Sequence, residues 1–307
     1  MTDSISYRAY AKINLYLDVL ARRGDGYHNI ETIFQSVSLA DALSFTRQES
    51  GISLKCSNPE LDDGSSNLAY RAAALLQERS GVSYGARIYL EKKIPIAAGL
   101  AGGSANAAAT LAGLNYLWNA GLTKGRLREL ALELGSDVPY CLTGGTRAAT
   151  GRGEELHYAA PLPLTWFVLL HPPIAVSTSR VYNSPRLEKN PEQPEGGKTP
   201  SFRRAIEALK RGDLAEAVFN RMEAPVFADY PHLAEAKQRL IEAGCPAAAM
   251  SGSGPTLFGV CNSRDHAMQV AGRISDYRST IVYSVSQGET AGSADRPGWL
   301  SPWPATL

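Results

Sequence analysis

A glycine-rich loop constrains the fold of this chain more than any other segment. Residues 94–107 read IPIAAGLAGGSANA, between an alternating apolar stretch at 87–94 and apolar residues spaced three or four apart along 105–118. The first pattern predicts a strand that Pro95 ends, and the second predicts a helix that begins at about Ser104. A strand, a loop of small residues and a helix in this order are typical of α/β proteins.

Such a loop has two interpretations. Its backbone N–H groups can converge on a phosphate without obstruction from side chains, and the helix N-terminus adds unpaired N–H groups and the positive end of its dipole. Alternatively, the small residues only pack closely in a tight turn. The loop lacks the lysine of a Walker A loop, the register of the dinucleotide fingerprint and the glycine spacing of a serine-nucleophile elbow. Ser251-Gly-Ser-Gly-Pro255 also lacks that elbow spacing.

The length of the chain favours two domains, because 307 residues exceed the size at which a single core stops growing. Strand and helix patterns alternate up to about residue 160, so we expect an α/β domain over 1–160 and an α+β domain over 161–287. The polar tail over 288–307 is expected to be mobile. A formal net charge of +1 gives no electrostatic footprint for nucleic acid or an anionic membrane, although a small anionic ligand is compatible with it.

The remaining periodicities predict the other elements. Strands are expected at 13–19, 33–39, 42–45, 87–94, 166–170, 247–250, 256–260 and 280–284. Helices are expected at 67–79, 105–118, 127–134, 202–210, 214–221, 233–243 and 266–274. Loops are expected at 21–32 and, over a long polar stretch, at 187–200.

The four cysteines indicate a reducing compartment. Cys56, Cys141, Cys245 and Cys261 lie far apart and show no C-x-x-C spacing, so we expect buried, reduced thiols and neither a zinc site nor a disulfide framework. The N-terminus lacks the basic and apolar regions of a secretory signal, and no apolar run approaches the roughly 20 residues that a membrane helix needs. We therefore expect no membrane partner and a cytoplasmic location, or the stroma of a plastid.

Three further segments place polar residues where chemistry is possible. Asp137 lies in Gly-Ser-Asp-Val-Pro directly after a predicted helix, Lys12 begins a predicted strand in Ala-Lys-Ile-Asn, and Met250-Ser-Gly-Ser-Gly-Pro-Thr256 is a second glycine loop. Each has a plain alternative: an aspartate that caps a turn, a solvated surface lysine and a simple hairpin.

Together these segments resemble the GHMP kinase superfamily. They are, in order, A-K-I-N-L, G-D-G-Y-H, P-x-x-x-G-L-x-G-G-S-A, G-S-D-V-P and S-G-S-G-P. The first segment, A-K-I-N-L, and the second in its longer form, D-G-Y-H-N-I-E-T, are typical of the 4-diphosphocytidyl-2-C-methyl-D-erythritol kinase family in particular. The resemblance extends from about Ala11 to Val260.

The resemblance implies a two-domain α/β kinase fold with the active site in the cleft between the domains. It also implies phosphorylation of the 2-hydroxyl of a small cytidylyl substrate in the non-mevalonate isoprenoid precursor pathway. ATP and Mg²⁺ are the implied cofactors. No nucleic-acid partner is expected, and the protein is expected to be a monomer or a weak homodimer.

The resemblance further assigns site residues. Asp137 would be the catalytic base and Lys12 its charged neighbour. Ser104 would lie near the β and γ phosphates and Mg²⁺, whereas no acidic Mg²⁺ ligand is assigned. The implied nucleotide-binding residues are Asn67, Leu68, Pro95, Ile96, Ala97, Ala98, Gly99, Leu100, Ala101, Gly102, Gly103, Ser104 and Ala105, with Ala101 where the family usually has glycine. The implied substrate-binding residues are Asn14, Tyr27, His28, Thr178 and Tyr182, with the two tyrosines on the faces of cytosine and His28 at its edge.

The residue types suit phosphoryl transfer to an alcohol. A carboxylate within hydrogen-bond reach can accept the hydroxyl proton, a lysine beside it keeps the carboxylate ionised, and loop amides stabilise charge on the transferring group. No serine or cysteine nucleophile is needed, so direct in-line transfer is predicted.

Three alternatives stay open. The first is another GHMP kinase, for homoserine, mevalonate or a sugar, which Gly-Tyr-His disfavours because those substrates carry no base. The second is a non-catalytic nucleotide or metabolite binder on the same fold, which the presence of both Lys12 and Asp137 disfavours. The third is a Rossmann-type oxidoreductase, which is disfavoured because the loop lacks G-x-G-x-x-G in register after the strand.

Overall fold

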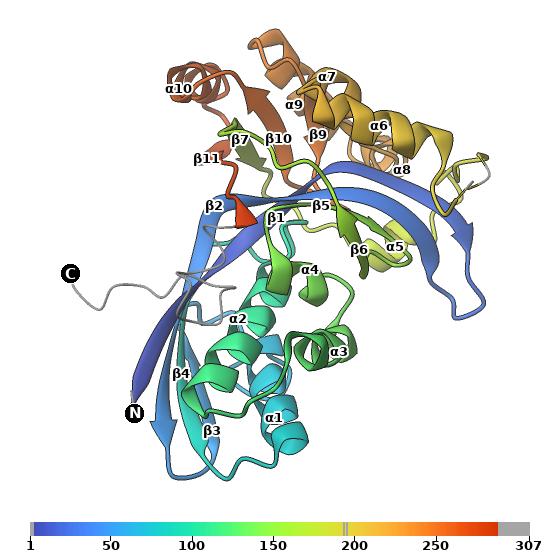
Figure 1. Cartoon of the computed structure of the whole chain (residues 1–307). Helices are drawn as coiled ribbons and strands as arrows, with labels where there is room; N and C mark the ends of the chain where they lie inside the picture. Colours follow the sequence, from blue (N-terminus) through green and yellow to red (C-terminus); the bar gives the residue numbers. More distant parts are fainter. Residues whose placement is uncertain (1–2, 193, 195, 288–307) are drawn as a thin grey trace.

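The computed structural model describes residues 3–192, 194 and 196–287, and its strands form two sheets against which the helices pack (Figure 1). The seven-stranded sheet has the order β3-β4-β2-β1-β8, with β5 paired to β2 and β6 paired to β5. Its strands are β1 (Ser4–Arg22), β2 (His28–Gln48), β3 (Ile52–Cys56), β4 (Gly85–Glu91), β5 (Thr146–Thr150), β6 (Glu155–Tyr158) and β8 (Phe219–Asn220). The four-stranded sheet has the order β11-β7-β10-β9 and comprises β7 (Trp166–His171), β9 (Ala248–Met250), β10 (Leu257–Cys261) and β11 (Arg278–Tyr283).

Ten helices complete the described part of the chain. They are α1 (Leu68–Ser80), α2 (Gly102–Leu117), α3 (Lys124–Leu134), α4 (Val138–Thr143), α5 (Thr178–Tyr182), α6 (Pro200–Lys210), α7 (Leu214–Ala217), α8 (Glu223–Asp229), α9 (Pro231–Glu242) and α10 (Arg264–Arg273).

The two longest strands form the central ribbon of the molecule. β1 and β2 pair antiparallel from Ser4 opposite Thr46 to Arg22 opposite His28 (Figure 1). The prediction of two separate strands at 33–39 and 42–45 is wrong, because β2 continues through the interruption of the apolar pattern. Ala40 and Asp41 pair regularly with Tyr10 and Ala9. The register shifts just before them, between Ala40 opposite Tyr10 and Ser36 opposite Lys12, so the irregularity is a bulge at 37–39 and not a turn. The predicted loop at 21–32 is correspondingly shorter, since β2 begins at His28.

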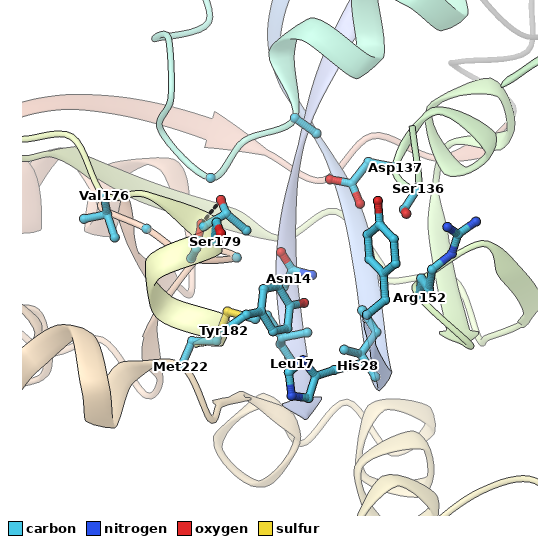
Figure 2. Close-up of a pocket in the computed structure, with 18 of the residues that line it drawn as sticks. Asn14, Leu17, His28, Ser136, Asp137, Arg152, Val176, Ser179, Tyr182 and Met222 are labelled. Carbon is cyan, nitrogen blue, oxygen red and sulfur yellow. Dashed lines mark hydrogen bonds between the residues drawn. The ribbon is translucent and has the colours of Figure 1, made fainter. Parts of the chain in front are cut away.

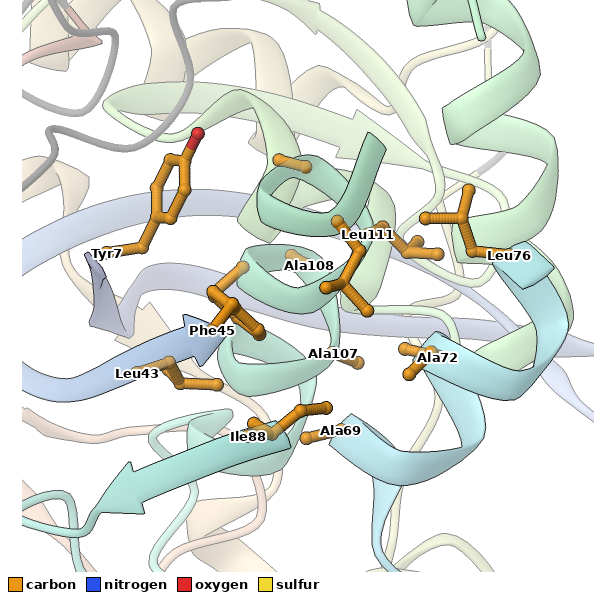
Figure 3. Close-up of a cluster of buried hydrophobic side chains, with 14 of the residues drawn as sticks. Tyr7, Leu43, Phe45, Ala69, Ala72, Leu76, Ile88, Ala107, Ala108 and Leu111 are labelled. Atoms are coloured by element: carbon orange, nitrogen blue, oxygen red, sulfur yellow. The ribbon is translucent and has the colours of Figure 1, made fainter. Parts of the chain in front are cut away.

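One hydrophobic core lies between the first sheet and the helices α1 to α4. Leu43, Phe45 and Ile88 of the sheet meet small residues such as Ala69 and Ala108 of α1 and α2 (Figure 3). Alanine and glycine let these layers approach closely: a Cβ placed on Gly113 of α2 would lie 2.7 Å from the ring of Phe45. This packing fixes α2, and with it the glycine loop that precedes α2.

The four-stranded sheet is covered on both faces. On one face Phe167, Leu169 and Phe258 pack against residues of β1, β2 and α6 such as Ile13 and Phe202. The other face packs against α9 and α10. The central ribbon therefore contributes to the cores of both halves, and β8, although it comes late in the sequence, pairs with β1 in parallel.

Three predicted boundaries differ from the structure for identifiable reasons. The strand predicted at 87–94 ends at Glu91, because the amides of Lys93 and Ile94 donate to the carboxylate of Asp41 at 2.7 and 2.8 Å. The helix expected to begin at about Ser104 begins at Gly102. The helix predicted at 214–221 is wrong in its second half, because Val218 adopts an extended conformation and β8 follows.

Other expectations are met or lie outside the structure. Cys56, Cys245 and Cys261 are buried free thiols, as expected, and Cys141 is a half-buried free thiol. The prediction of a mobile tail falls on 288–307, which is outside the described residues. Within those residues, no helix is long and apolar enough to cross a membrane. The domain boundary at 160 stays a proposal, since strands from both sides of it join the first sheet.

Candidate active site

A cavity of about 730 Å³ lies between the two halves of the chain. Figure 2 shows Ser136, Asp137 and Arg152 on one side of it and Tyr182 and Met222 on the other. The first half contributes β1, the turn after β1, the glycine loop and the residues before α4, and the second half contributes α5 and the loop at 252–254. The expected position of the active site, in a cleft between domains, stays a proposal, and this cavity is the place in the structure that fits it.

Lys12 is a buried residue on the wall of this cavity. Its Nζ donates to Asn14 Oδ1 at 2.8 Å and to the carbonyl of Gly99 at 3.1 Å, and it lies 3.6 Å from Oδ2 of Asp137. Only 5% of the Lys12 side chain is exposed, so the alternative of a solvated surface lysine is wrong. A buried ammonium needs such partners, because an unpaired charge in this environment is strongly destabilising.

Asn14 is oriented from behind by the β1–β2 pair. Its Nδ2 donates to Thr32 Oγ1 at 2.9 Å, and the Thr32 hydroxyl donates to the carbonyl of Tyr16 at 2.7 Å. These bonds leave the Asn14 carbonyl oxygen facing Lys12. The cross-strand chain of hydrogen bonds therefore holds the Lys12 ammonium through Asn14 Oδ1, within 3.6 Å of Asp137.

Asp137 precedes α4 but does not cap it. Its backbone has φ −82° and ψ −16°, and its side chain accepts no capping hydrogen bond. The alternative of a structural helix or turn cap is therefore not what the structure shows. About a third of the carboxylate side chain is exposed to the cavity. This arrangement leaves a carboxylate lone pair available to a substrate hydroxyl.

The glycine loop is held in an unusual backbone conformation by the second glycine loop. Ala97, Gly99 and Ala101 all have positive φ, at 51°, 74° and 55°. The hydroxyl of Ser251 donates to the carbonyl of Gly99 at 2.9 Å, and a Cβ placed on Gly99 would lie 2.1 Å from the carbonyl oxygen of Ser251. The two loops thus touch through backbone, which requires glycine at position 99.

The start of α2 faces a second cavity of about 390 Å³. Ala101 provides no side-chain cap, so the first amides of α2 have no capping acceptor from that residue. Of the residues expected to bind nucleotide, all but the buried Ala105 line this second cavity. Asn67 lies there as the N-cap of α1, with Oδ1 accepting from Ala69 N at 3.0 Å. Four loop residues line both cavities, namely Ala97, Gly99, Ala101 and Ser104.

The aromatic residues of the substrate side are arranged differently from the predicted pair of tyrosines. The ring of His28, and not that of Tyr27, faces Tyr182, at 5.4 Å between centroids and 14° between planes. Tyr27 is 55% exposed and lies under the guanidinium of Arg152, 4.9 Å from the ring centroid. Burial, together with the charges of Lys189 and Arg22, lowers the pKa of His28, so its imidazole is neutral at pH 7.

Thr178 joins the second half of the chain to the site. Its hydroxyl shares a 2.7 Å hydrogen bond with that of Ser253, which links the start of α5 to the S-G-S-G-P loop. Ser177 caps α5 by accepting from Arg180 N. The short helix therefore presents Thr178 and Tyr182 to the same cavity.

Sequence reasoning missed Arg152, a cation on the wall of the cavity of about 730 Å³. It lies in the turn between β5 and β6, between Gly151 and Gly153, which both have positive φ. The carbonyl of Gly151 accepts from Ile30 N at 2.7 Å, so the turn is anchored to β2. The available signal was an arginine flanked by glycines in T-G-R-G-E, a pattern that by itself indicates only a turn.

Ser104 is the residue that the sequence places near a metal ion. Ser104 lines both cavities, and Asp137 lines the first of them. In the described residues no group of three or more His, Cys, Asp or Glu side chains could hold a metal. A serine hydroxyl such as that of Ser104 fits Mg²⁺, because this ion is usually bound by few protein oxygens, with substrate phosphates and water as its other ligands.

Comparisons with known proteins identify the family. The models named GHMP kinases N terminal domain and GHMP kinases C terminal match residues 67–145 and 202–279. The chain is 49% identical to the 4-diphosphocytidyl-2-C-methyl-D-erythritol kinase of Moorella thermoacetica over 284 residues, covering 91% of this chain and 98% of that protein. It belongs to the 4-diphosphocytidyl-2-C-methyl-D-erythritol kinase family. It is therefore an ATP-dependent small-molecule kinase.

Further similarities agree with membership of this kinase family. The kinase of the same name from Synechococcus sp. strain JA-3-3Ab is 44% identical over 291 residues, covering 92% of this chain and 94% of that protein. A crystal structure of 4-(cytidine 5'-diphospho)-2C-methyl-D-erythritol kinase superposes with a TM-score of 0.77 at 37% identity, covering 91% and 99% of the two chains. A homoserine kinase from Cytophaga hutchinsonii, with a TM-score of 0.72 and 19% identity over 99% and 98%, shares the fold.

Proposed function

We propose that this chain phosphorylates the 2-hydroxyl of 4-diphosphocytidyl-2-C-methyl-D-erythritol, with ATP as donor, in the non-mevalonate isoprenoid precursor pathway. The observation that carries the proposal is the pair of Lys12 and Asp137, 3.6 Å apart in a cavity that shares a wall with the glycine loop. The names of the relatives supply the substrate.

Asp137 acts as the general base. Its partly exposed carboxylate accepts the proton of the 2-hydroxyl as the oxygen attacks the γ-phosphorus and ADP leaves. Lys12, 3.6 Å from that carboxylate, reduces its repulsion of the incoming phosphate oxygens. Because Asn14 and the Gly99 carbonyl hold the ammonium in place, the pair needs no rearrangement for the reaction.

The glycine loop and the start of α2 bind the ATP phosphates. The loop offers backbone amides, and the uncapped helix N-terminus adds its dipole. Ser104 and the phosphates would hold Mg²⁺, which supplies neutralisation of charge on the transferring group. Transfer is proposed to be direct and in line. Burial and the charge of Asp137 raise the pKa of the Cys141 thiol beside the site, which makes that thiol a poor nucleophile.

The cytidylyl group lies against Tyr182, Tyr27 and His28. A neutral imidazole carries one donor and one acceptor, so His28 can match the polar edge of cytosine while tyrosine rings contact its faces. In the structure His28 already covers one face of Tyr182, so a base that stacks on that face must displace the imidazole toward its edge. Arg152 supplies a cation for the diphosphate of the substrate.

The protein is further proposed to act in the cytoplasm as a monomer or weak homodimer, with domains divided near residue 160. The free cysteines support a reducing compartment. Light scattering coupled to gel filtration measures the oligomeric state.

A panel of acceptors tests the proposed reaction. The purified chain is given ATP–Mg²⁺ with the cytidylyl substrate, homoserine, mevalonate, galactose or no acceptor, while ADP release and product mass are followed. We expect turnover with the cytidylyl substrate alone. Faster turnover with another acceptor would assign the chain to a different GHMP kinase activity, and ATP binding without any turnover would make it a binder.

A further inference from the structure

A buried ion pair lies beneath the glycine loop, outside the residues already given a role. Lys92 Nζ contacts Asp41 Oδ2, and the exposed fractions of the two side chains are 5% and 0%. The other oxygen of Asp41 accepts from the backbone amides of Lys93 and Ile94. Asp41 comes from β2 and Lys92 follows β4, so the pair joins the sheet to the first residues of the loop.

The ammonium of Lys92 lies beside the first turn of α2. A Cβ placed on Gly102, the first residue of α2, would be 3.1 Å from Lys92 Nζ, and Lys92 lines the cavity of about 390 Å³. A cation at the positive end of a helix dipole is unfavourable by itself. An anion at the same helix end reverses that effect, because it attracts both the dipole and the ammonium.

The hydrogen bonding of the pair leaves Lys92 able to act on a ligand. An ammonium has three N–H donors, and across the described residues Asp41 is its one hydrogen-bond acceptor. The Asp41 carboxylate, by contrast, already has three donors. The neighbouring Lys93 differs from Lys92 in exposure and in partner. Its side chain is 52% exposed and pairs with Glu91 at 3.0 Å on the surface.

We propose that Lys92, held by Asp41, is a cationic element of the nucleotide site that favours the phosphates of ATP. The proposal rests on the proposed use of this cavity for nucleotide. Asp41 is the positioning residue: it directs the ammonium toward the start of α2 and fixes the backbone at Lys93 and Ile94. The pair thereby sets both a charge and the position of the loop that receives the phosphates.

Nucleotide binding in variants of the chain tests this role. Dissociation constants for ATP, ADP and AMP, each with Mg²⁺, are measured for Lys92→Met, Lys92→Arg and the surface control Lys93→Met by competition with a fluorescent ATP analogue. Loss of a charge-assisted contact should weaken ATP binding by about tenfold or more in Lys92→Met, with a smaller loss for ADP and the least for AMP. Lys92→Arg should recover most of the affinity, and Lys93→Met should match the parent.

A double variant protects the test against a folding defect. Lys92→Met alone leaves the buried Asp41 carboxylate unpaired, which is destabilising. The double variant Asp41→Asn with Lys92→Met removes both charges, should remain folded by thermal melting, and should show the same graded loss of nucleotide affinity.

Equal losses for ATP, ADP and AMP would overturn the proposal, because Lys92 would then support the loop without acting on phosphate. Parent-like ATP binding in either Lys92 variant that lacks the charge would overturn it as well. Neither result depends on the acceptor substrate, so the assignment of the cytidylyl substrate is tested separately by the acceptor panel.

Discussion

Ala101 is one of two alanines of the glycine loop, with Ala97, that have a positive φ. It has φ 55° and ψ 31° at the N-cap of α2, a left-handed conformation that a Cβ disfavours. The family resemblance marks position 101 as one where glycine is usual. The left-handed backbone conformation that explains this preference is visible only in the structure.

Ala101→Gly is therefore expected to stabilise the protein. Relief of the left-handed conformation should exceed the extra chain entropy that glycine loses on folding, for a net gain of about 0.5–1 kcal/mol in the free energy of unfolding. Urea unfolding measures the change. Ala105→Gly, inside the same helix, is the control and should destabilise by about 1 kcal/mol or more. If Ala101→Gly were no more stable than the parent, the left-handed strain would be absent.

His28 tests the recognition of the base at the residue scale. Uracil exchanges the donor and acceptor of the cytosine edge, and such a mismatch costs about 1–3 kcal/mol per buried group. We expect His28→Ala to lower the preference in kcat/KM for the cytidylyl over the uridylyl substrate by about tenfold. Tyr27→Ala should instead weaken the binding of both substrates to the same extent. An unchanged ratio in His28→Ala would remove His28 from base recognition.

At the scale of elements, the long and strongly patterned segments could be predicted and the short ones could not. The helix at 67–79 and its glycine stop are confirmed, because Asn67 caps α1 and Gly81 adopts the left-handed conformation that ends it. α5 and β8 have five and two residues, too few for a period to emerge. Both depend on tertiary contacts, and α5 carries two of the predicted substrate residues, so Thr178 and Tyr182 came from family resemblance alone.

Two glycines of the loop should respond differently to substitution. Gly103 meets only Leu68 Cδ1, at 3.3 Å from an added Cβ, so Gly103→Val should fold but lose the increase in melting temperature that ATP–Mg²⁺ produces. Gly99→Ala places its Cβ on the Ser251 carbonyl at positive φ, so it should lower the melting temperature without nucleotide as well. Equal stabilisation of Gly103→Val and the parent by ATP would place the phosphates elsewhere.

At the scale of the whole molecule, a half-buried histidine in the second sheet links stability to pH. His171 Nε2 lies 3.0 Å from Thr280 Oγ1, and its buried Nδ1 has no partner among the described residues. Burial and the charge of Arg278 lower the pKa of His171 to about 4, against an ordinary value of 6.5. Below pH 6.5 His171 is therefore protonated in the unfolded chain but still neutral in the folded chain. The free energy of unfolding consequently falls as the pH decreases from 6.5 to about 4.

His171→Gln should reduce this pH dependence. Between pH 7.5 and pH 5 the parent should lose about 1–2 kcal/mol more free energy of unfolding than the variant, by the linkage of the two pKa values. Urea unfolding at both pH values gives the difference, with the exposed His232→Gln as control. An identical pH dependence in His171→Gln and the parent would show that His171 is protonated as readily in the folded chain as in the unfolded one.

The central claim is that Asp137 and Lys12 carry out phosphoryl transfer to the cytidylyl substrate. The decisive measurement is kcat/KM with ATP–Mg²⁺ and that substrate for the parent, Asp137→Asn, Lys12→Met and the distant surface control Asp276→Asn, with the product located by ³¹P NMR. We predict phosphate on the 2-hydroxyl, a loss of roughly two to four orders of magnitude in Asp137→Asn and Lys12→Met with ATP binding retained, and none in Asp276→Asn. Near-normal turnover in Asp137→Asn, or phosphate on another group, would contradict the account.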